Sequence, residues 1–198
     1  MKINLIRKVI ILSVLLPVLV ILNLVFAAFF FGKSENFDNY NSIVIVISFV
    51  IVLIISKRFF LLNFGREKFI FKEFLIATIL AIFLFIIFYF EKVLFDVYIK
   101  SPISILMIFS IVLCLPIVEE LFVKKVILDN LILIGYKKIF VILIPSIYFA
   151  ILHFPEIYMT HLFVGLITSW VYYKNKSILQ VILIHFQYNL FIVVFNYL

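Results

Sequence analysis

Five polar residues lie inside otherwise apolar stretches of this chain, and together they have the chemistry of a hydrolytic site. The five are Glu119, Glu120, His153, His185 and Asn189. Ionisable groups cost about 2.5–3.5 kcal/mol each at the centre of a membrane helix, so their presence at such positions indicates function. A carboxylate and an imidazole can hold and deprotonate a water, while a second imidazole and an amide can donate to a developing oxyanion.

Helical spacing predicts which of these side chains point the same way. Residues four apart stack on one face of a helix, so His185 and Asn189 are expected to share a face. Phe149 and His153 have the same spacing, which would place an aromatic wall beside the imidazole. Each helix is therefore expected to bring a pair, rather than a single residue, to the site.

The two adjacent carboxylates are expected to take different roles. Glu120 and Lys124 stand at i,i+4 and can neutralise each other. Glu119 is rotated by about 100° from Glu120 and is free to face another partner. Pro116, three residues earlier, can bend the helix at this point. Because two carboxylates side by side in a low dielectric cannot both ionise cheaply, we expect them to differ in charge or in partner.

A metal site is the alternative use of the same residues. Glu119, His153 and His185 form a donor set of the kind that holds zinc, and a zinc ion would activate a bound water. The single Cys114 forms no internal disulfide, and it rules out a zinc site built from cysteines. The sequence leaves metal-free and zinc-assisted water activation both open.

The elements that must position these residues are membrane helices. The 198 residues are 67% hydrophobic and 14% charged, whereas a soluble domain is about 45–50% apolar and about 25% charged. We therefore expect an all-α, polytopic helix bundle. Residues 1–100 would be transmembrane helices without a specific motif, and residues 101–198 would carry the site. The heavy use of residues with A/T-rich codons indicates a low-GC genome, and we expect a multi-pass protein of a bacterial cell membrane.

The apolar runs predict about seven spans, because about 20 apolar residues cross a bilayer. In chain order they are 9–31, 42–56, 73–90, 103–120, 138–154, 157–173 and 177–197. Residues 91–102 are expected to form a polar loop. If the chain begins inside, only Lys33, Lys92 and Lys100 among the 17 Lys and Arg fall outside. The positive-inside rule thus favours an inside N-terminus. The basic residues flank spans and form no stripe on a polar domain, so we expect the lipid bilayer, and no nucleic acid, as their partner.

Straight spans do not bring the candidate residues to one depth. Glu119 would fall near the inner surface and His153 near the outer end of its span. The depths meet if the fourth and fifth spans are tilted and offset. They also meet if the fourth span continues past Lys124 and carries its charges into a polar cavity. Charged residues persist at membrane depth where they line water or pair with one another, and we expect this arrangement.

Three motifs, in this order, resemble the CPBP (Abi) family of intramembrane proteases. The family pattern is Glu-Glu-x-x-x-Arg, Phe-x-x-x-His and His-x-x-x-Asn, matched here from Glu119 to Lys124, from Phe149 to His153 and from His185 to Asn189. The family includes CAAX prenyl endopeptidases and bacteriocin-processing or immunity proteins, and the match covers roughly residues 118–190. There is one departure, because Lys124 occupies the arginine position. Lysine keeps the charge but lacks the bidentate fork of arginine.

The resemblance implies a helical membrane fold with a polar cavity opening toward the cytoplasm. It implies Glu119 as general base with His153 as its partner on the water. It also implies that His185 and Asn189 form an oxyanion site or complete a metal site, and that Glu120 is supporting and held by Lys124. The implied activity is intramembrane cleavage of a small peptide or a membrane-protein substrate.

Two other functions remain open at this stage. A non-catalytic family member could act as a bacteriocin immunity or regulatory protein, which the departure at Lys124 would favour. A transporter component could use the same polar residues as a proton or ion relay. Among the remaining polar residues, we expect Glu156 and His161 to be interfacial, and we expect Asp129 to form a structural pair with Lys125.

Overall fold

The computed structural model describes residues 42–47, 50, 71–95, 104–153 and 159–197. Within these ranges every regular element is helical, so the predicted all-α class is confirmed for this part of the chain. The predicted span at 9–31 and most of that at 42–56 lie outside the described residues. Residues 42–47 and 50, inside the predicted span at 42–56, are helical.

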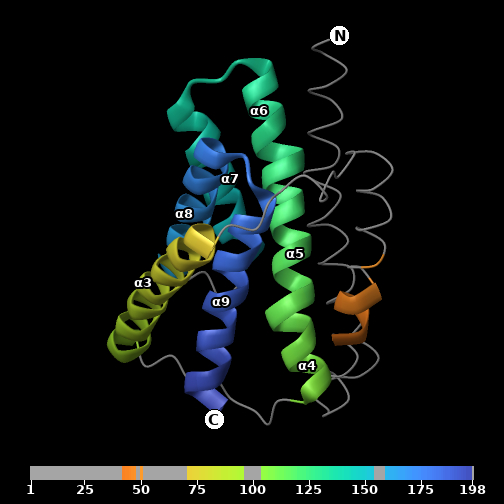
Figure 1. The fold of residues 1–198 in the computed structure, drawn as a ribbon, viewed down its shortest axis with the longest axis vertical. Coiled ribbons are helices and arrows are strands. Elements are labelled where there is room, and N and C mark those ends of the chain that lie inside the picture. The colour runs from red at the N-terminus through yellow and green to blue at the C-terminus, as the bar shows by residue number, and fades with distance from the viewer. Residues whose placement is uncertain (1–41, 48–49, 51–70, 96–103, 154–158, 198) are drawn as a thin grey trace.

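A continuous helical rod carries the Glu-Glu pair and runs the full height of the bundle (Figure 1). Its segments are α4 (Ile105–Phe109), the π-helical η2 (Ser110–Cys114), α5 (Leu115–Glu120), the π-helical η3 (Leu121–Leu128) and α6 (Asp129–Ile134). The prediction that this span continues past Lys124 is confirmed. The rod stops at Gly135, whose φ of 91° is the left-handed conformation that glycine adopts at helix ends.

Three further helices surround the rod on the C-terminal side of the chain. They are α7 (Lys138–Leu152), α8 (Met159–Asn175) and α9 (Ile178–Tyr197), close to the predicted spans at 138–154, 157–173 and 177–197. Helix α7 packs mainly on α8, and α9 packs on α8, α5 and η2. The N-terminal neighbour α3 (Phe71–Phe95) lies along α9.

Three of the described helices are long and apolar enough to cross a membrane, namely those at Phe71–Leu94, Ile105–Ile134 and Ile178–Asn196. The shorter helix at Lys138–Leu152 is apolar as well. The rod of 30 residues is about 45 Å long at about 1.5 Å per residue, which exceeds a hydrocarbon core of about 30 Å. A helix of this length spans a bilayer with room to tilt.

The expected polar loop at 91–102 is wrong in its first part, because α3 continues through Glu91 to Phe95. Glu91 is buried, and its carboxylate accepts hydrogen bonds from the backbone N–H groups of Met159 and Thr160 and from the Thr160 hydroxyl. The first N–H groups of a helix have no partner within it, and they favour a negative charge. Glu91 therefore caps α8 from a neighbouring helix, a role that its position in the sequence does not reveal.

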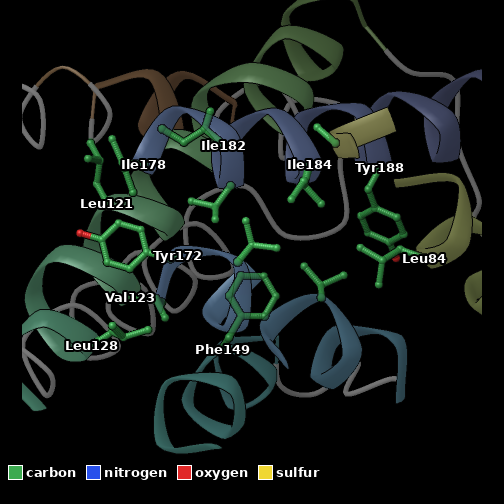
Figure 2. Packing of buried hydrophobic residues seen from close by; sticks show 14 of the residues in the cluster. Leu84, Leu121, Val123, Leu128, Phe149, Tyr172, Ile178, Ile182, Ile184 and Tyr188 are labelled. Carbon is green, nitrogen blue, oxygen red and sulfur yellow. The ribbon is translucent and has the colours of Figure 1, made fainter. Parts of the chain in front are cut away.

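The hydrophobic core lies between α3, α7, α8, α9 and the rod. Figure 2 shows Phe149 of α7 and Tyr172 of α8 below the α9 residues Ile182 and Ile184. Phe149 and Ile184 are completely buried. Helices α7 and α8 approach closely at Gly165, where an added Cβ would lie 2.8 Å from backbone atoms of Ser146. This packing fixes the distance between the helices that carry the site.

Candidate active site

Glu119 brings residues of three helices to one carboxylate. Its Oε1 lies 3.9 Å from Nε2 of His153, at the C-terminal end of α7. Its Oε2 lies 3.7 Å from Nε2 of His185 on α9. Only 8% of the Glu119 surface is exposed. The three residues that the sequence placed at different depths therefore meet, because the rod carries Glu119 inside the bundle.

Glu120 contacts the other ring nitrogen of His185 and also pairs with a lysine. Its Oε1 lies 3.1 Å from Nδ1 of His185, and its Oε2 lies 3.3 Å from Nζ of Lys124. Glu120 and Lys124 are both completely buried. The predicted i,i+4 pair is thus confirmed, and the contact with His185 adds a link between the rod and α9.

The contacts of the two Nδ1 atoms indicate how the imidazoles are oriented. Nδ1 of His153 lies 2.9 Å from the carbonyl oxygen of Phe149, and a carbonyl oxygen only accepts. Nδ1 of His185 likewise faces the Glu120 carboxylate. Each Nδ1 is therefore a donor, and each ring turns Nε2 toward Glu119. The site presents one carboxylate to two Nε2 atoms.

Phe149 forms the aromatic wall predicted beside His153 and also contacts the second histidine. Its ring centroid lies 4.9 Å from that of His153 and 5.4 Å from that of His185, with the latter pair edge-to-face. The Lys124 Nζ lies 6.0 Å from the same ring centroid. One buried aromatic ring thus keeps both imidazoles in place.

Asn189 contacts the rod at a carbonyl that the rod leaves without a helical donor. In the π turn of η2, the N–H of Leu115 bonds to the carbonyl of Ser110 and not to that of Ile111. The next residue, Pro116, has no N–H to offer. The Asn189 Nδ2 donates to the Ile111 carbonyl at 3.0 Å. One amide hydrogen of Asn189 is therefore engaged, and the second remains for another acceptor.

The sequence interpretation missed a hydroxyl pair behind Lys124. Lys124 donates to Oγ of Ser169 at 3.1 Å, and the Ser146 and Ser169 hydroxyl oxygens lie 3.4 Å apart. Both serines are completely buried. Serine is common inside membrane helices, so the sequence gives no signal for the contact of Lys124 with Ser169. The close approach of Gly165 to Ser146 brings the contact about, and the sequence does not show that approach.

His161 lies nearer to the site than the expected interfacial position. Its ring stacks on that of His153 with centroids 4.0 Å apart and an interplanar angle of 17°. This contact places the start of α8 beside the end of α7. Glu156, the other residue expected to be interfacial, lies outside the described residues.

The donor set does not gather as a metal-ligand cluster. Two imidazoles and a carboxylate are the kind of ligands that zinc takes. Among the residues that the structure describes, however, no three His, Cys, Asp or Glu side chains lie close enough together to hold an ion.

One comparison with known proteins identifies this region. Residues 101–191 match the family model described as "Type II CAAX prenyl endopeptidase Rce1-like". Comparison with curated proteins and with solved structures gives no match. The matched segment contains the whole rod from Ile105 and all five candidate residues, and the family supports an intramembrane protease. The resemblance drawn from the three motifs is confirmed, because residues 101–191 match the model of the Rce1-like type II CAAX prenyl endopeptidase family.

Proposed function

We propose that this protein is an intramembrane endopeptidase in which Glu119 activates the attacking water between His153 and His185. The observation that carries the proposal is a buried carboxylate facing two Nε2 atoms at 3.7 and 3.9 Å. Where two polar atoms lie more than about 3.5 Å apart, a water can bridge them. Glu119 would take a proton from that water and later deliver it to the leaving amine.

The two histidines support this step with Nε2 atoms that accept hydrogen bonds. A water has two O–H donors, which Glu119 and one imidazole can share. The Nδ1–H groups are held by the Phe149 carbonyl and by Glu120, so neither ring turns freely. Fixed acceptors around the water place its lone pair toward the substrate carbonyl, which favours attack by orientation.

The oxyanion formed on attack needs a donor that is already oriented, and Asn189 supplies one. Its amide is anchored to Ile111 through one hydrogen, which leaves the second N–H for the developing negative charge. An anchored donor is worth more than a mobile one, because it does not reorient during the reaction. In this proposal Asn189 is both a contact between helices and part of the oxyanion site.

The proposal uses no metal ion, because the described side chains form no three-ligand set. Glu120 and Lys124 support His185 and do not contact the water. The substrate in this proposal is a small peptide or a membrane protein, since the site lies within a bundle whose helices can span the bilayer. The family name points to a C-terminal peptide of a prenylated protein as one probe.

The test uses purified protein in proteoliposomes with a mixture of membrane peptides and identifies new termini by mass spectrometry. Glu119→Gln removes the base with minimal change of shape, and cleavage should fall by on the order of 100- to 10,000-fold. The matched control is Glu73→Gln, the same change on α3 and away from the site; it should cleave like wild type.

Three results would overturn the proposal. New termini that appear equally with wild type and a folded Glu119→Gln would exclude Glu119 as the base. Failure of wild type to cleave any peptide, while the cells it is expressed in gain bacteriocin resistance that Glu119→Gln preserves, would favour the immunity or regulatory function. Flux of protons or ions through wild-type proteoliposomes without cleavage would favour the transporter function.

A further inference from the structure

We propose that Ser169 is a positioning residue of this site, acting on His185 through Lys124 and Glu120. It supplies the hydrogen-bond acceptor that allows a lysine to stand at the arginine position of the family motif. The kinetic consequence rests on the proposed function. The geometric part concerns only the chain of contacts from Ser169 through Lys124 and Glu120 to His185. No motif of the sequence contains Ser169.

The first step is the hydrogen bonding of the Lys124 ammonium. An ammonium group has three donors and cannot accept, and this one is completely buried. It forms an ion pair with Glu120 Oε2 at 3.3 Å and donates a hydrogen bond to Ser169 Oγ at 3.1 Å. Arginine spreads its charge over a planar fork and can bind a carboxylate through two nitrogens, whereas lysine is a point charge. A second partner beside Glu120 therefore matters more for lysine than for arginine.

The packing of α7 on α8 brings Ser169 within reach of Lys124. Helices α7 and α8 approach so closely at Gly165 that a Cβ there would lie 2.8 Å from Ser146. Ser146 in turn lies 3.4 Å from the Ser169 hydroxyl and donates to the Ile142 carbonyl at 2.6 Å. The Ser169 hydroxyl is thus enclosed on the α7 side and faces Lys124 on the other.

The contacts of Lys124 and Glu120 determine the orientation of His185. Lys124 holds one oxygen of Glu120, and the other oxygen of Glu120 lies 3.1 Å from Nδ1 of His185. The same imidazole faces Glu119 through Nε2 at 3.7 Å. If Lys124 loses Ser169, its ammonium must move toward its remaining partner, and Glu120 must turn with it. His185 then loses the orientation that directs Nε2 toward Glu119.

The test compares Ser169→Ala with Thr168→Val. Thr168 is the adjacent buried residue, and its hydroxyl bonds only within α8, to the carbonyls of Val164 and Gly165. Loss of a hydrogen bond to a buried charge should lower kcat of Ser169→Ala on the order of 10- to 100-fold. KM should stay within about twofold, because Ser169 does not contact substrate in the proposed mechanism. Thr168→Val should retain both constants.

A second variant separates positioning from a general packing defect. Replacing Lys124 by arginine in the Ser169→Ala background gives Glu120 a bidentate partner that does not need the hydroxyl. We expect this double variant to recover at least about tenfold of the lost kcat. If Ser169→Ala and Thr168→Val have the same kcat, or if the arginine variant recovers nothing while both proteins unfold at the wild-type temperature, the inference is wrong.

A readout without catalysis keeps this inference distinct from the proposed function. In detergent-solubilised protein, the ring-nitrogen NMR signals of His185 should shift in Ser169→Ala and not in Thr168→Val, because Glu120 lies against Nδ1. Shifted signals in a protein that cleaves nothing would support the positioning and refute the protease. Unshifted signals in an active protease would refute the positioning and leave the protease intact.

Discussion

Two adjacent lysines on the rod show how differently the same sequence spacing is used. Lys124 pairs with Glu120, four residues before it, at 3.3 Å, and both side chains are completely buried. Lys125 pairs with Asp129, four residues after it, at 3.8 Å, and both side chains keep more than a fifth of their surface exposed. The spacing alone makes the two pairs look equivalent, and only their surroundings separate them.

The partly exposed pair of Lys125 and Asp129, here called the outer pair, belongs to a network with many partners. Asp129 also accepts from the Tyr172 hydroxyl at 2.8 Å and lies 3.2 Å from Nζ of Lys176. Lys125 and Lys176 each lie 5.2 Å from the Tyr172 ring centroid. Because water can replace any one of these partners, loss of one contact leaves the others satisfied. The predicted structural pairing of Lys125 with Asp129 is confirmed, as part of this network.

The buried pair of Lys124 and Glu120, here called the inner pair, has few partners, and water cannot replace any of them. Lys124 has Glu120 and Ser169, and Glu120 has Lys124 and His185. A buried ion pair adds little net stability over a hydrophobic pair, but removal of one partner leaves an uncompensated buried charge. We infer that the inner pair serves the geometry of the site, whereas each contact of the outer pair can be replaced within its partly exposed network.

The largest effect should come from Lys124→Met. The substitution keeps the volume and removes the charge, so Glu120 would be left buried beside His185 alone. We expect a loss of about 3–5 kcal/mol in the free energy of unfolding, measured by denaturant unfolding in detergent micelles. The double variant Lys124→Met with Glu120→Gln removes both charges and should recover part of the loss. A single variant as stable as wild type would show that the inner pair is not held in a low dielectric.

Gly165→Ala should have the second largest effect. The added methyl group would meet backbone atoms of Ser146 at 2.8 Å, and backbone cannot move aside as a flexible side chain does. Overpacking of this kind costs about 1–3 kcal/mol. Because the clash separates α7 from α8, kcat should fall together with the unfolding midpoint. Wild-type stability in the variant would mean that the two helices can slide apart without cost.

Lys125→Met should change stability by less than about 1 kcal/mol, because exposed ion pairs contribute little and Lys176 still faces Asp129. The measurement is the same unfolding experiment, repeated at low and high salt. The small difference from wild type should shrink further at 1 M salt, where charges are screened within about 3 Å. A loss as large as that of Lys124→Met would abolish the distinction between the two pairs.

Removal of metal ions should have the smallest effect. We expect that incubation with a strong zinc chelator leaves cleavage within about twofold of the untreated enzyme, because the described side chains form no group of three metal ligands. Activity is measured before and after chelation, with zinc added back as the control. Loss of activity that zinc alone restores would assign Glu119, His153 and His185 to a metal site and contradict the metal-free step.

Sequence spacing predicted the contacts that lie within one helix. Glu120 with Lys124, Lys125 with Asp129 and Phe149 with His153 are all four residues apart, and all three are present. These predictions succeed because the helical repeat fixes the relative direction of such residues whatever surrounds them. The apolar amino-acid composition likewise predicted the helical class, since a chain this apolar must satisfy its backbone hydrogen bonds within helices.

Only the tertiary structure decided the contacts between helices. Glu119 with two histidines, Lys124 with Ser169, His153 with His161 and Glu91 with the start of α8 join residues far apart in the chain. Such contacts depend on the register and separation of packed helices, which here follow from Gly165 and the π turns of the rod. The sequence alone thus determined a helical membrane protein with catalytic residue types at helical spacing. The packing of four helices decided which of those residues meet, because depth and register are properties of the assembled bundle and not of any one helix.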